Sequence, residues 1–414
     1  PSSEGLPDSG EALKKLENLL SGEPLADGRV HYGVAAHAVY TCSEETLLRS
    51  SWAKLIFKAH KFDSLPRLAW CASLERGGSE VQLFHGSSVE CDERMFSAGA
   101  WDGSFQESAL LSSHTVVGSC GQCLDDSVYF IPPSDMYLWL NMIVTETKVL
   151  VSNSLAFLLS SAQEELCIEY PDYHFDLLHF RRWGLRKPTC ELPTKSGRSV
   201  QLVKWENFSF DSQLNFKIHS KPHPAEPQDF QEYFEFLSRS VKRTIDNAND
   251  HSRQVRYRPK TTISTGYDST TLSVLAAAAG CREALTFSTQ HQDLTKSNDS
   301  GLKIGQLLGL QVKEYPRRAY QDLTNLVEAE FSASMPRPGG APMAVAEPEV
   351  EGSILLMGRP GEDFWGLDEI YNLPDLICPD AQNTAGSSYN EFFLRTGTLQ
   401  FRAAYIGAIH RLAL

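Results

Sequence analysis

Residues 264–269, Ser-Thr-Gly-Tyr-Asp-Ser, combine the side chains and the setting of an anion-binding loop. The preceding residues 261–264 are rich in β-branched side chains, which favours a buried strand. Residues 272–279 are strong helix formers, and Gly280 suits the end of that helix. A loop at a helix N-terminus presents free N–H groups and the positive end of the helix dipole to a ligand. We therefore predict that this loop binds a phosphate-like anion.

The composition of the loop separates it from the common nucleotide-binding loop. The pattern G-x-x-x-x-G-K-[ST] is absent, and no Lys lies between Ser264 and Ser269. Gly266 is expected to supply backbone freedom at the turn, while Asp268 and Ser269 favour a helix start. A carboxylate such as that of Asp268 requires a cation between itself and a phosphate, and Mg²⁺ is a cation of this kind.

The segment Ser264–Ser269 resembles the S-G-G-x-D-S loop of the ATP pyrophosphatase (PP-loop) family, with Thr265 where the second residue is usually Gly. Other segments resemble asparagine-synthetase-like members of that family in the same order. They are the strand 284–288, the pair Asn298-Asp299, the helix 304–310, the strand 311–315 and the stretch 353–366. The last stretch is similar to the family's G-x-G-x-D-E-x-x-G motif with the acidic pair reversed, as Glu362-Asp363. The likeness covers about residues 230–370 well and the N-terminal half more faintly.

The resemblance implies a site for ATP and Mg²⁺. Its expected ATP- and pyrophosphate-binding residues are Ser264, Thr265, Gly266, Tyr267, Asp268, Ser269, Ser288, Asp299 and Gly358. Mg²⁺ is expected on Asp268 together with Glu362 or Asp363. Amide-forming members use a Lys in the C-terminal part as a catalytic cation, but no Lys follows Lys313 here. Arg359 is the expected substitute, with Arg395, Arg402 and Arg411 as alternatives, and a longer C-terminal region is the other explanation.

The implied activity is that of a carbon–nitrogen ligase. Such an enzyme adenylates a carboxylate with ATP, releases pyrophosphate and passes the acyl group to an amine or ammonia, leaving AMP. A small-molecule or peptide carboxylate is the expected substrate. One alternative is a nucleotide-binding pseudoenzyme that acts as a scaffold, and another is a PP-loop enzyme of nucleobase or sulfur transfer.

The N-terminal half is similar to a class II glutaminase domain in residues 98–105 and 149–159. That domain uses an N-terminal Cys as nucleophile, whereas this chain begins with Pro1 and its first Cys is Cys42. Either leading residues are missing or the glutaminase activity is lost, and we expect loss, as in the β-lactam synthetases and lasso-peptide cyclases that the chain resembles.

The expected fold class is α/β. Residues 1–218 are expected to form an α+β sandwich like an N-terminal-nucleophile glutaminase domain. Residues 219–228 are Pro-rich and suit a linker. Residues 229–414 are expected to form a parallel-sheet PP-loop domain of the adenine nucleotide α-hydrolase-like type, with the C-terminus as a candidate truncation.

The length, charge and cysteine content of the chain indicate its domain number, its partners and its location. The chain has 414 residues, which favours two domains, and a formal net charge of -14, which disfavours nucleic acid. The nine cysteines are scattered along the chain and no signal peptide is visible, which predicts a cytoplasmic protein. Every apolar run is too short to span a bilayer, which predicts that the protein has no membrane segment. The sequence leaves the oligomeric state open, with a homodimer as one option.

The spacing of apolar residues predicts several further helices and strands. Helices are expected over residues 45–60 and 229–247. Strands are expected within residues 69–85, 128–133 and 199–218. Cys120-Gly121-Gln122-Cys123 is a C-x-x-C pattern, typical of a redox pair or half a zinc site. Because no second pair accompanies it, two loop cysteines without a metal are the favoured interpretation.

Overall fold

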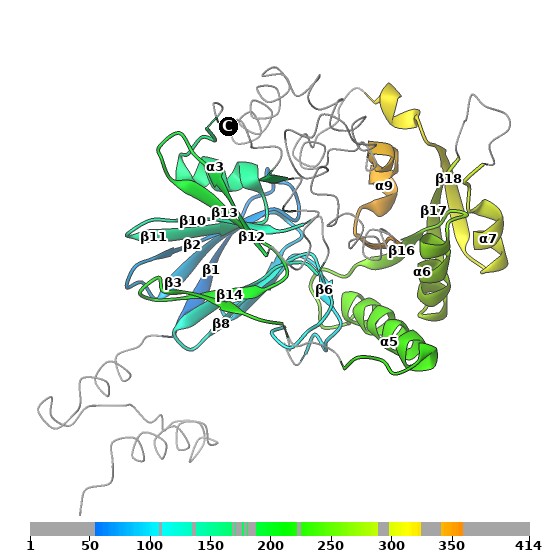
Figure 1. Cartoon of the computed structure of the whole chain (residues 1–414), viewed down its shortest axis with the longest axis horizontal. Coiled ribbons are helices and arrows are strands. Elements are labelled where there is room, and N and C mark those ends of the chain that lie inside the picture. Colours follow the sequence, from blue (N-terminus) through cyan, green and yellow to red (C-terminus); the bar gives the residue numbers. More distant parts are fainter. Residues whose placement is uncertain are drawn as a thin grey trace, which may run out of the picture.

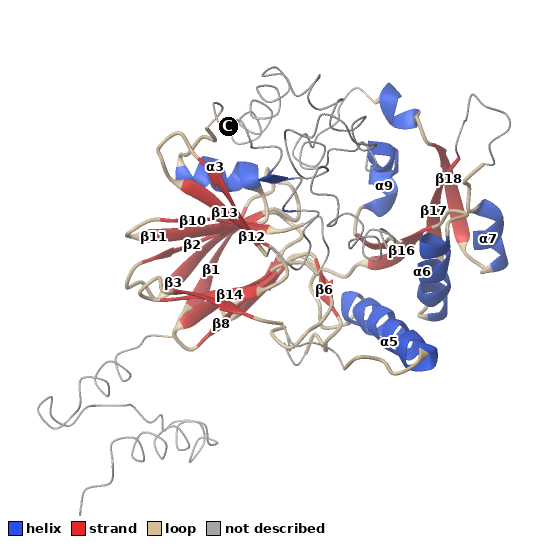
Figure 2. Ribbon diagram, in the orientation of Figure 1, coloured by secondary structure: helices blue, strands red, loops and turns tan. Residues whose placement is uncertain are grey.

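The computed structural model describes residues 54–106, 110–134, 138–167, 170, 176–177, 180, 188–221, 225–288, 298–323 and 341–358. These residues form an α/β structure in which two large sheets pack face to face and a smaller parallel sheet with its helices stands beside them (Figure 1). Figure 2 shows that strands dominate the first part, whereas helices and strands alternate in the second.

The first large sheet has seven strands in the order β1-β3-β2-β11-β10-β13-β12. Its neighbours are antiparallel except for β1 and β3, which run parallel. The strands are β1 (Ile56–Lys61), β2 (Trp70–Glu75), β3 (Glu80–His85), β10 (Leu140–Val144), β11 (Lys148–Ser152), β12 (Thr189–Pro193) and β13 (Ser199–Val203).

The second large sheet has six strands in the order β15-β14-β9-β8-β5-β4, all paired antiparallel. They are β4 (Glu90–Cys91), β5 (Met95–Ser97), β8 (Cys120–Leu124), β9 (Ser127–Ile131), β14 (Asn207–Asp211) and β15 (Phe216–His219). A short pair, β6 (Ala100–Trp101) and β7 (Val116–Val117), extends this part of the chain toward the helices.

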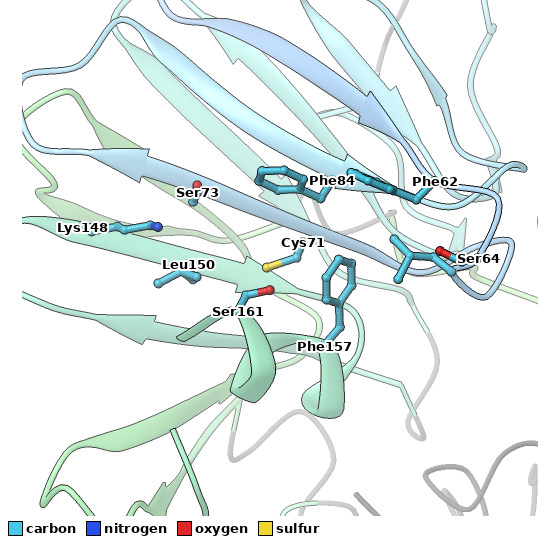
Figure 3. A pocket seen from close by; sticks show the side chains of 10 residues that line it. Phe62, Ser64, Cys71, Ser73, Phe84, Lys148, Leu150, Phe157 and Ser161 are labelled. Atoms are coloured by element: carbon cyan, nitrogen blue, oxygen red, sulfur yellow. The ribbon is translucent and has the colours of Figure 1, made fainter. Parts of the chain in front are cut away.

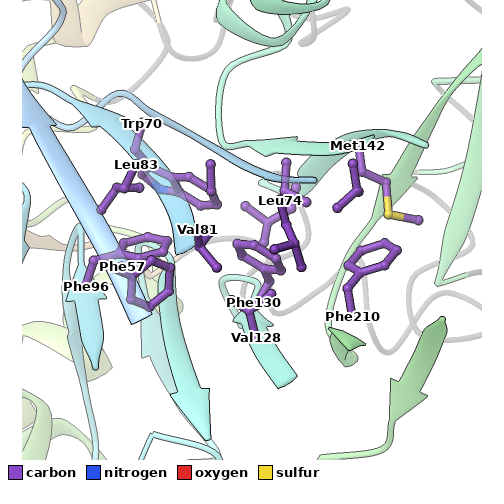
Figure 4. Close-up of a cluster of buried hydrophobic side chains, with 14 of the residues drawn as sticks. Phe57, Trp70, Leu74, Val81, Leu83, Phe96, Val128, Phe130, Met142 and Phe210 are labelled. Carbon is purple, nitrogen blue, oxygen red and sulfur yellow. The ribbon is translucent and has the colours of Figure 1, made fainter. Parts of the chain in front are cut away.

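Aromatic and aliphatic side chains fill the space between the two sheets (Figure 4). Trp70 of β2 stacks on Phe130 of β9 with ring centroids 6.0 Å apart, and it meets Phe96 of β5 edge-on at 4.6 Å. Its indole N–H donates to Ser119 Oγ over 2.9 Å, so that the one polar atom of the ring is satisfied. Rings of this size each bury about 150–250 Å², so each of them contributes substantially to the stability of the sandwich.

Helix α3 (Leu155–Ala162) covers the outer face of the seven-stranded sheet. Ser154 caps it by accepting a hydrogen bond from the Phe157 N–H over 3.2 Å. The helix then packs Leu158 and Leu159 against Leu202 and other apolar side chains of the sheet.

The parallel sheet has four strands in the order β18-β17-β16-β19. They are β16 (Arg258–Thr262), β17 (Glu283–Ser288), β18 (Gln311–Pro316) and β19 (Ser353–Leu356). The helices of this part are α5 (Phe230–Ala248), α6 (Tyr267–Ala278), α7 (Leu302–Leu307) and α9 (Glu347–Val350), and its 3₁₀ helices are η3 (Ala319–Asp322) and η4 (Ala341–Ala346). Asp229 caps α5 by accepting the Glu232 N–H over 2.9 Å.

A buried ion pair joins the second large sheet to the loop that follows α5. The Arg253 guanidinium, with a fully buried side chain, donates to Glu90 Oε2 over 2.6 and 2.9 Å. It also donates to the Gly99 carbonyl over 2.6 Å and to Asn247 Oδ1 over 2.8 Å. Three rings surround it, with Cζ-to-centroid distances of 5.7, 4.7 and 5.3 Å for Trp101, Phe105 and Tyr257. The sandwich and the parallel sheet therefore share a fully hydrogen-bonded charge.

The expected helix over residues 45–60 is wrong where the structure describes it. Residues 56–61 form β1, whose backbone pairs with β3 and whose Lys58 lies 3.3 Å from Glu80. Pairing with a strand some twenty residues further on overrides the local helical pattern.

The C-x-x-C pattern lies in strand β8 and not in a loop, which corrects the favoured interpretation. Cys120 and Cys123 are three residues apart, so their side chains point to opposite faces. Cys120 packs with Met95 and Trp101, whereas Cys123 belongs to the core between the two large sheets. Burial raises the pKa of Cys120 to about 11 and that of Cys123 to about 12. Both therefore pack as neutral thiols.

Candidate functional site

The candidate site lies where the strand order of the parallel sheet changes direction. From β16 the chain continues to β17 and β18 on one side, while β19 returns on the other side of β16. Open α/β sheets bind ligands outside the carboxyl ends of their strands at such a switch point. Here those ends lead into residues 263–266 after β16 and residues 357–358 after β19.

The loop after β16 is held by two serine hydroxyls. Ser264 Oγ and Ser269 Oγ lie 2.7 Å apart, and Ser269 Oγ accepts the Ser264 N–H over 3.1 Å. Ser264 Oγ also accepts the Gly266 N–H over 3.1 Å. Thr270 fixes the same turn from the helix by donating to the Ser264 carbonyl over 3.1 Å. The loop is thus closed on itself by its own side chains, which orders its backbone.

The tip of the loop faces solvent at the N-terminus of α6. Residues 265–268 are exposed, and Tyr267 is 93% exposed. Asp268 lies in the first turn of the helix, where a carboxylate is favourable, and Ser269 turns inward. This arrangement offers the helix dipole, the N–H groups of the first turn and one carboxylate to a ligand from outside.

Gly266 has a different role from the one expected. Its φ of -72° is available to any residue, so the turn does not need the backbone freedom of glycine. A Cβ at this position would lie 3.2 Å from Ser264 Oγ. Glycine therefore leaves room for the hydroxyl pair. Gly266 is also the N-cap of α6, so Asp268 and Ser269 lie inside the helix.

Gly358 meets the loop from the end of β19. A Cβ on Gly358 would overlap the Asp268 carbonyl oxygen and lie 2.5 Å from Ser269 N. Two backbones approach each other here as closely as a glycine permits. Gly358 and Asp268, both expected in the site and far apart in the sequence, are therefore neighbours.

Asp299 supports the loop from the segment before α7. Thr265 donates from Oγ1 to Asp299 Oδ1 over 2.8 Å and from its N–H to the Asp299 carbonyl over 3.3 Å. Ser300 forms an isolated β-bridge with Ser264. Arg317 Nη1 lies 4.0 Å from Asp299 Oδ2, which places a guanidinium at the edge of the loop. Asp299 itself precedes α7, which begins at Leu302.

Ser288 ends β17 and is bound to the neighbouring strand. Its hydroxyl donates to the Tyr315 carbonyl over 3.4 Å, and its carbonyl accepts the Arg317 N–H over 3.1 Å. It lies at the same edge of the sheet as the loop because both follow parallel strands.

Three expected site residues, Arg359, Glu362 and Asp363, lie outside the described residues. Within the described part of the chain, no group of three or more His, Cys, Asp or Glu side chains could hold a metal ion. The same part contains no helix of the length and apolar character that crossing a membrane requires.

Sequence reasoning missed the polar contacts that hold α6 to the sheet. Thr261 Oγ1 lies 3.0 Å from Ser273 Oγ and donates to the Leu356 carbonyl over 3.2 Å, and Ser273 donates to the Thr262 carbonyl over 3.2 Å. These bonds connect β16, α6 and β19 beneath the loop. The signal was the spacing of Ser269 and Ser273, which places two hydroxyls on one helix face.

Comparisons with known proteins do not assign the chain to a family. No model of a protein family matches the chain, and a search of curated protein sequences finds no relative.

Proposed function

We propose that residues 264–269 bind the pyrophosphate part of ATP and that the chain is an AMP- and pyrophosphate-forming amide ligase of the asparagine-synthetase-like type. The observation that carries this proposal is the loop after β16. It is ordered by the Ser264–Ser269 pair, exposed at a helix N-terminus and in backbone contact with Gly358. The close approach of Gly358, after β19, to the first turn of α6 favours a ligand that needs backbone N–H groups close at hand.

The chemistry of each group in the loop suggests its role in binding ATP. Backbone N–H groups at the start of α6 and the Ser264 and Ser269 hydroxyls would donate to phosphate oxygens. Arg317, beside Asp299, would add a cation at the rim. Arg359 directly follows Gly358 in the sequence and is proposed as the catalytic cation.

The chemistry at the loop fits Mg²⁺. Asp268 is an exposed carboxylate in the first turn of α6, and oxygen ligands are those that Mg²⁺ prefers. Glu362 and Asp363 follow Gly358 by only a few residues in the sequence, and both are carboxylates. Asp268 with Glu362 or Asp363 would hold the ion, which supplies charge neutralisation to the phosphates when bound.

The proposed reaction has two steps. A substrate carboxylate attacks the α-phosphorus of ATP, forming an acyl-adenylate as the bond to pyrophosphate breaks. An amine or ammonia then attacks the acyl carbon, forming the amide as AMP leaves with the bonding electron pair and a proton is lost from nitrogen. The chain's part in both steps is to position the reactants and stabilise negative charge.

The sandwich supports the same proposal. Two packed sheets with α3 on an outer face are compatible with a glutaminase-like α+β domain. We propose that the nitrogen of the amide comes from an amine or from ammonia. A cytoplasmic location and the absence of nucleic-acid partners belong to the proposal, the latter supported by the net charge of -14.

A second candidate is a nucleotide-binding protein without ligase activity. The bond between Thr265 and Asp299 favours it, because a side chain here replaces the glycine usual in the family and uses one carboxylate of the site. Such a protein would bind Mg-ATP and release no pyrophosphate.

An ATP–pyrophosphate exchange assay with a panel of small and peptide carboxylates tests the ligase. We expect exchange that depends on one carboxylate class, is lost in Asp268→Asn and persists in Asp246→Asn, an exposed carboxylate paired with Lys242 on α5. Mg-ATP binding without exchange across the panel would contradict the ligase and favour the second candidate.

A further inference from the structure

A cavity of about 420 Å³ opens between the outer face of the seven-stranded sheet and α3 (Figure 3). It belongs to the sandwich and shares no residue with the loop after β16. Its size lies in the range of small-molecule sites, and its walls are mostly apolar with a few polar groups, as is typical of such sites.

Three aromatic side chains line the wall. Phe62 and Phe84 stack with centroids 6.2 Å apart, and Phe157 faces them from α3. Phe62 remains 45% exposed, which is a large apolar area to leave in water at the mouth of a cavity. Cys71 lines the floor, and burial raises the pKa of its thiol to about 12, so it acts there as a small neutral group.

One cation points into this apolar space. Lys148 begins β11, and Figure 3 shows its ammonium directed along the cavity toward Cys71. Its register partner on β2 is Glu75, yet no described carboxylate lies within 4.0 Å of the ammonium. The hydroxyls of Ser73 and Ser161 add donors on either side. A cation without a carboxylate beside apolar walls favours a ligand that brings its own negative charge.

We propose that this cavity binds an amphipathic monocarboxylate whose apolar body lies among Phe62, Phe84 and Phe157 and whose carboxylate pairs with Lys148. A single ammonium with neutral hydroxyls matches one negative charge better than the two of a phosphate monoester. The proposal does not depend on the function of the loop after β16.

Calorimetric titration with octanoate and with 1-octanol tests it on the full chain. We expect octanoate to bind at least tenfold more tightly than 1-octanol. Lys148→Met should weaken octanoate at least tenfold and change 1-octanol by less than twofold. Lys58→Met serves as the matched control because Lys58 lies on β1 of the same sheet and pairs with Glu80.

A second variant locates the ligand without touching the core. Ser161 is exposed on α3, so Ser161→Phe should fill the cavity and abolish binding of both probes while the melting temperature stays within a few degrees. Equal octanoate affinity in wild type and Lys148→Met, undiminished binding in Ser161→Phe, or no octanoate binding to wild type would each overturn the proposal.

Discussion

The Thr265 hydroxyl donates a hydrogen bond to Asp299 Oδ1 over 2.8 Å, which ties the loop after β16 to the segment that leads into α7. A backbone hydrogen bond joins the same two residues, since the Thr265 N–H donates to the Asp299 carbonyl over 3.3 Å. The Thr265 side chain therefore helps to hold the loop against the segment before α7. The shape of the loop depends on a residue that follows a different strand.

Thr265→Val should weaken Mg-ATP binding about fivefold, because it keeps the shape of the side chain and removes one hydrogen bond of about 1 kcal/mol. Titration calorimetry measures the effect. In a double-mutant cycle with Asp299→Ala, which removes the acceptor, the two changes should be non-additive. Fully additive losses would show that the two side chains do not act together.

Gly358→Ala should reduce Mg-ATP binding more than tenfold, because its Cβ would lie 2.5 Å from Ser269 N and force the two backbones apart. Gly352→Ala is the matched control at the start of β19. Its φ of +64° makes alanine cost about 1 kcal/mol of stability, but nothing lies near its Cβ. Equal losses of ATP affinity in both variants would mean that Gly358 acts only through stability.

Arg253→Met should destabilise the protein by about 3–5 kcal/mol in urea unfolding, because it leaves Glu90 buried without its charge partner. The double variant Arg253→Met with Glu90→Leu should recover part of that loss. Lys242→Met breaks the exposed pair with Asp246 and should cost less than about 1 kcal/mol. A loss that small for Arg253→Met would contradict the role of the buried pair.

Lys221 should make stability depend on pH in the alkaline range. Burial lowers the pKa of Lys221 from 10.5 to about 8, and nearby Cys120, Glu206 and Asp102 offset the shift only partly. Between these values the unfolded chain binds more protons than the folded one, so this group's contribution to stability rises with pH.

The measurement is urea unfolding between pH 7.5 and 10 for wild type and Lys221→Met. We expect the free energy of unfolding of wild type to gain on the order of 1–3 kcal/mol relative to the variant over this range. Taking the difference removes the titration of Cys71 and Cys123, which acts in the opposite direction because burial raises the pKa values of both thiols. If the difference in the free energy of unfolding between wild type and Lys221→Met did not change with pH, the Lys221 ammonium would be exposed to water in the folded protein.

The local pattern predicts the elements around the loop well. Residues 284–288 and 311–315 were expected as strands and are β17 and β18 almost to the residue. β16 covers Arg258–Thr262, so it both starts and ends earlier than the β-branched run over residues 261–264 suggests, and its Pro259 lies opposite Ile354. These successes come from alternating or β-branched runs bounded by turn residues.

The contacts that build the site could not be predicted in the same way. Thr265 meets Asp299, and Gly358 meets Asp268, only after three strands have paired in their final order. Residues 56–61 show the same limit, since their strand depends on β3 and not on their own sequence. The roles of Arg359 and of residues 362–363 stay predictions.

Calorimetric titration of Mg-ATP into wild type, Asp268→Asn and Asp246→Asn shows whether the N-terminus of α6 is a nucleotide site. We expect that wild type binds Mg-ATP, that Asp268→Asn loses at least tenfold in affinity and that Asp246→Asn stays within twofold. Equal affinity in all three proteins, or no binding to wild type, would contradict a nucleotide site at the N-terminus of α6.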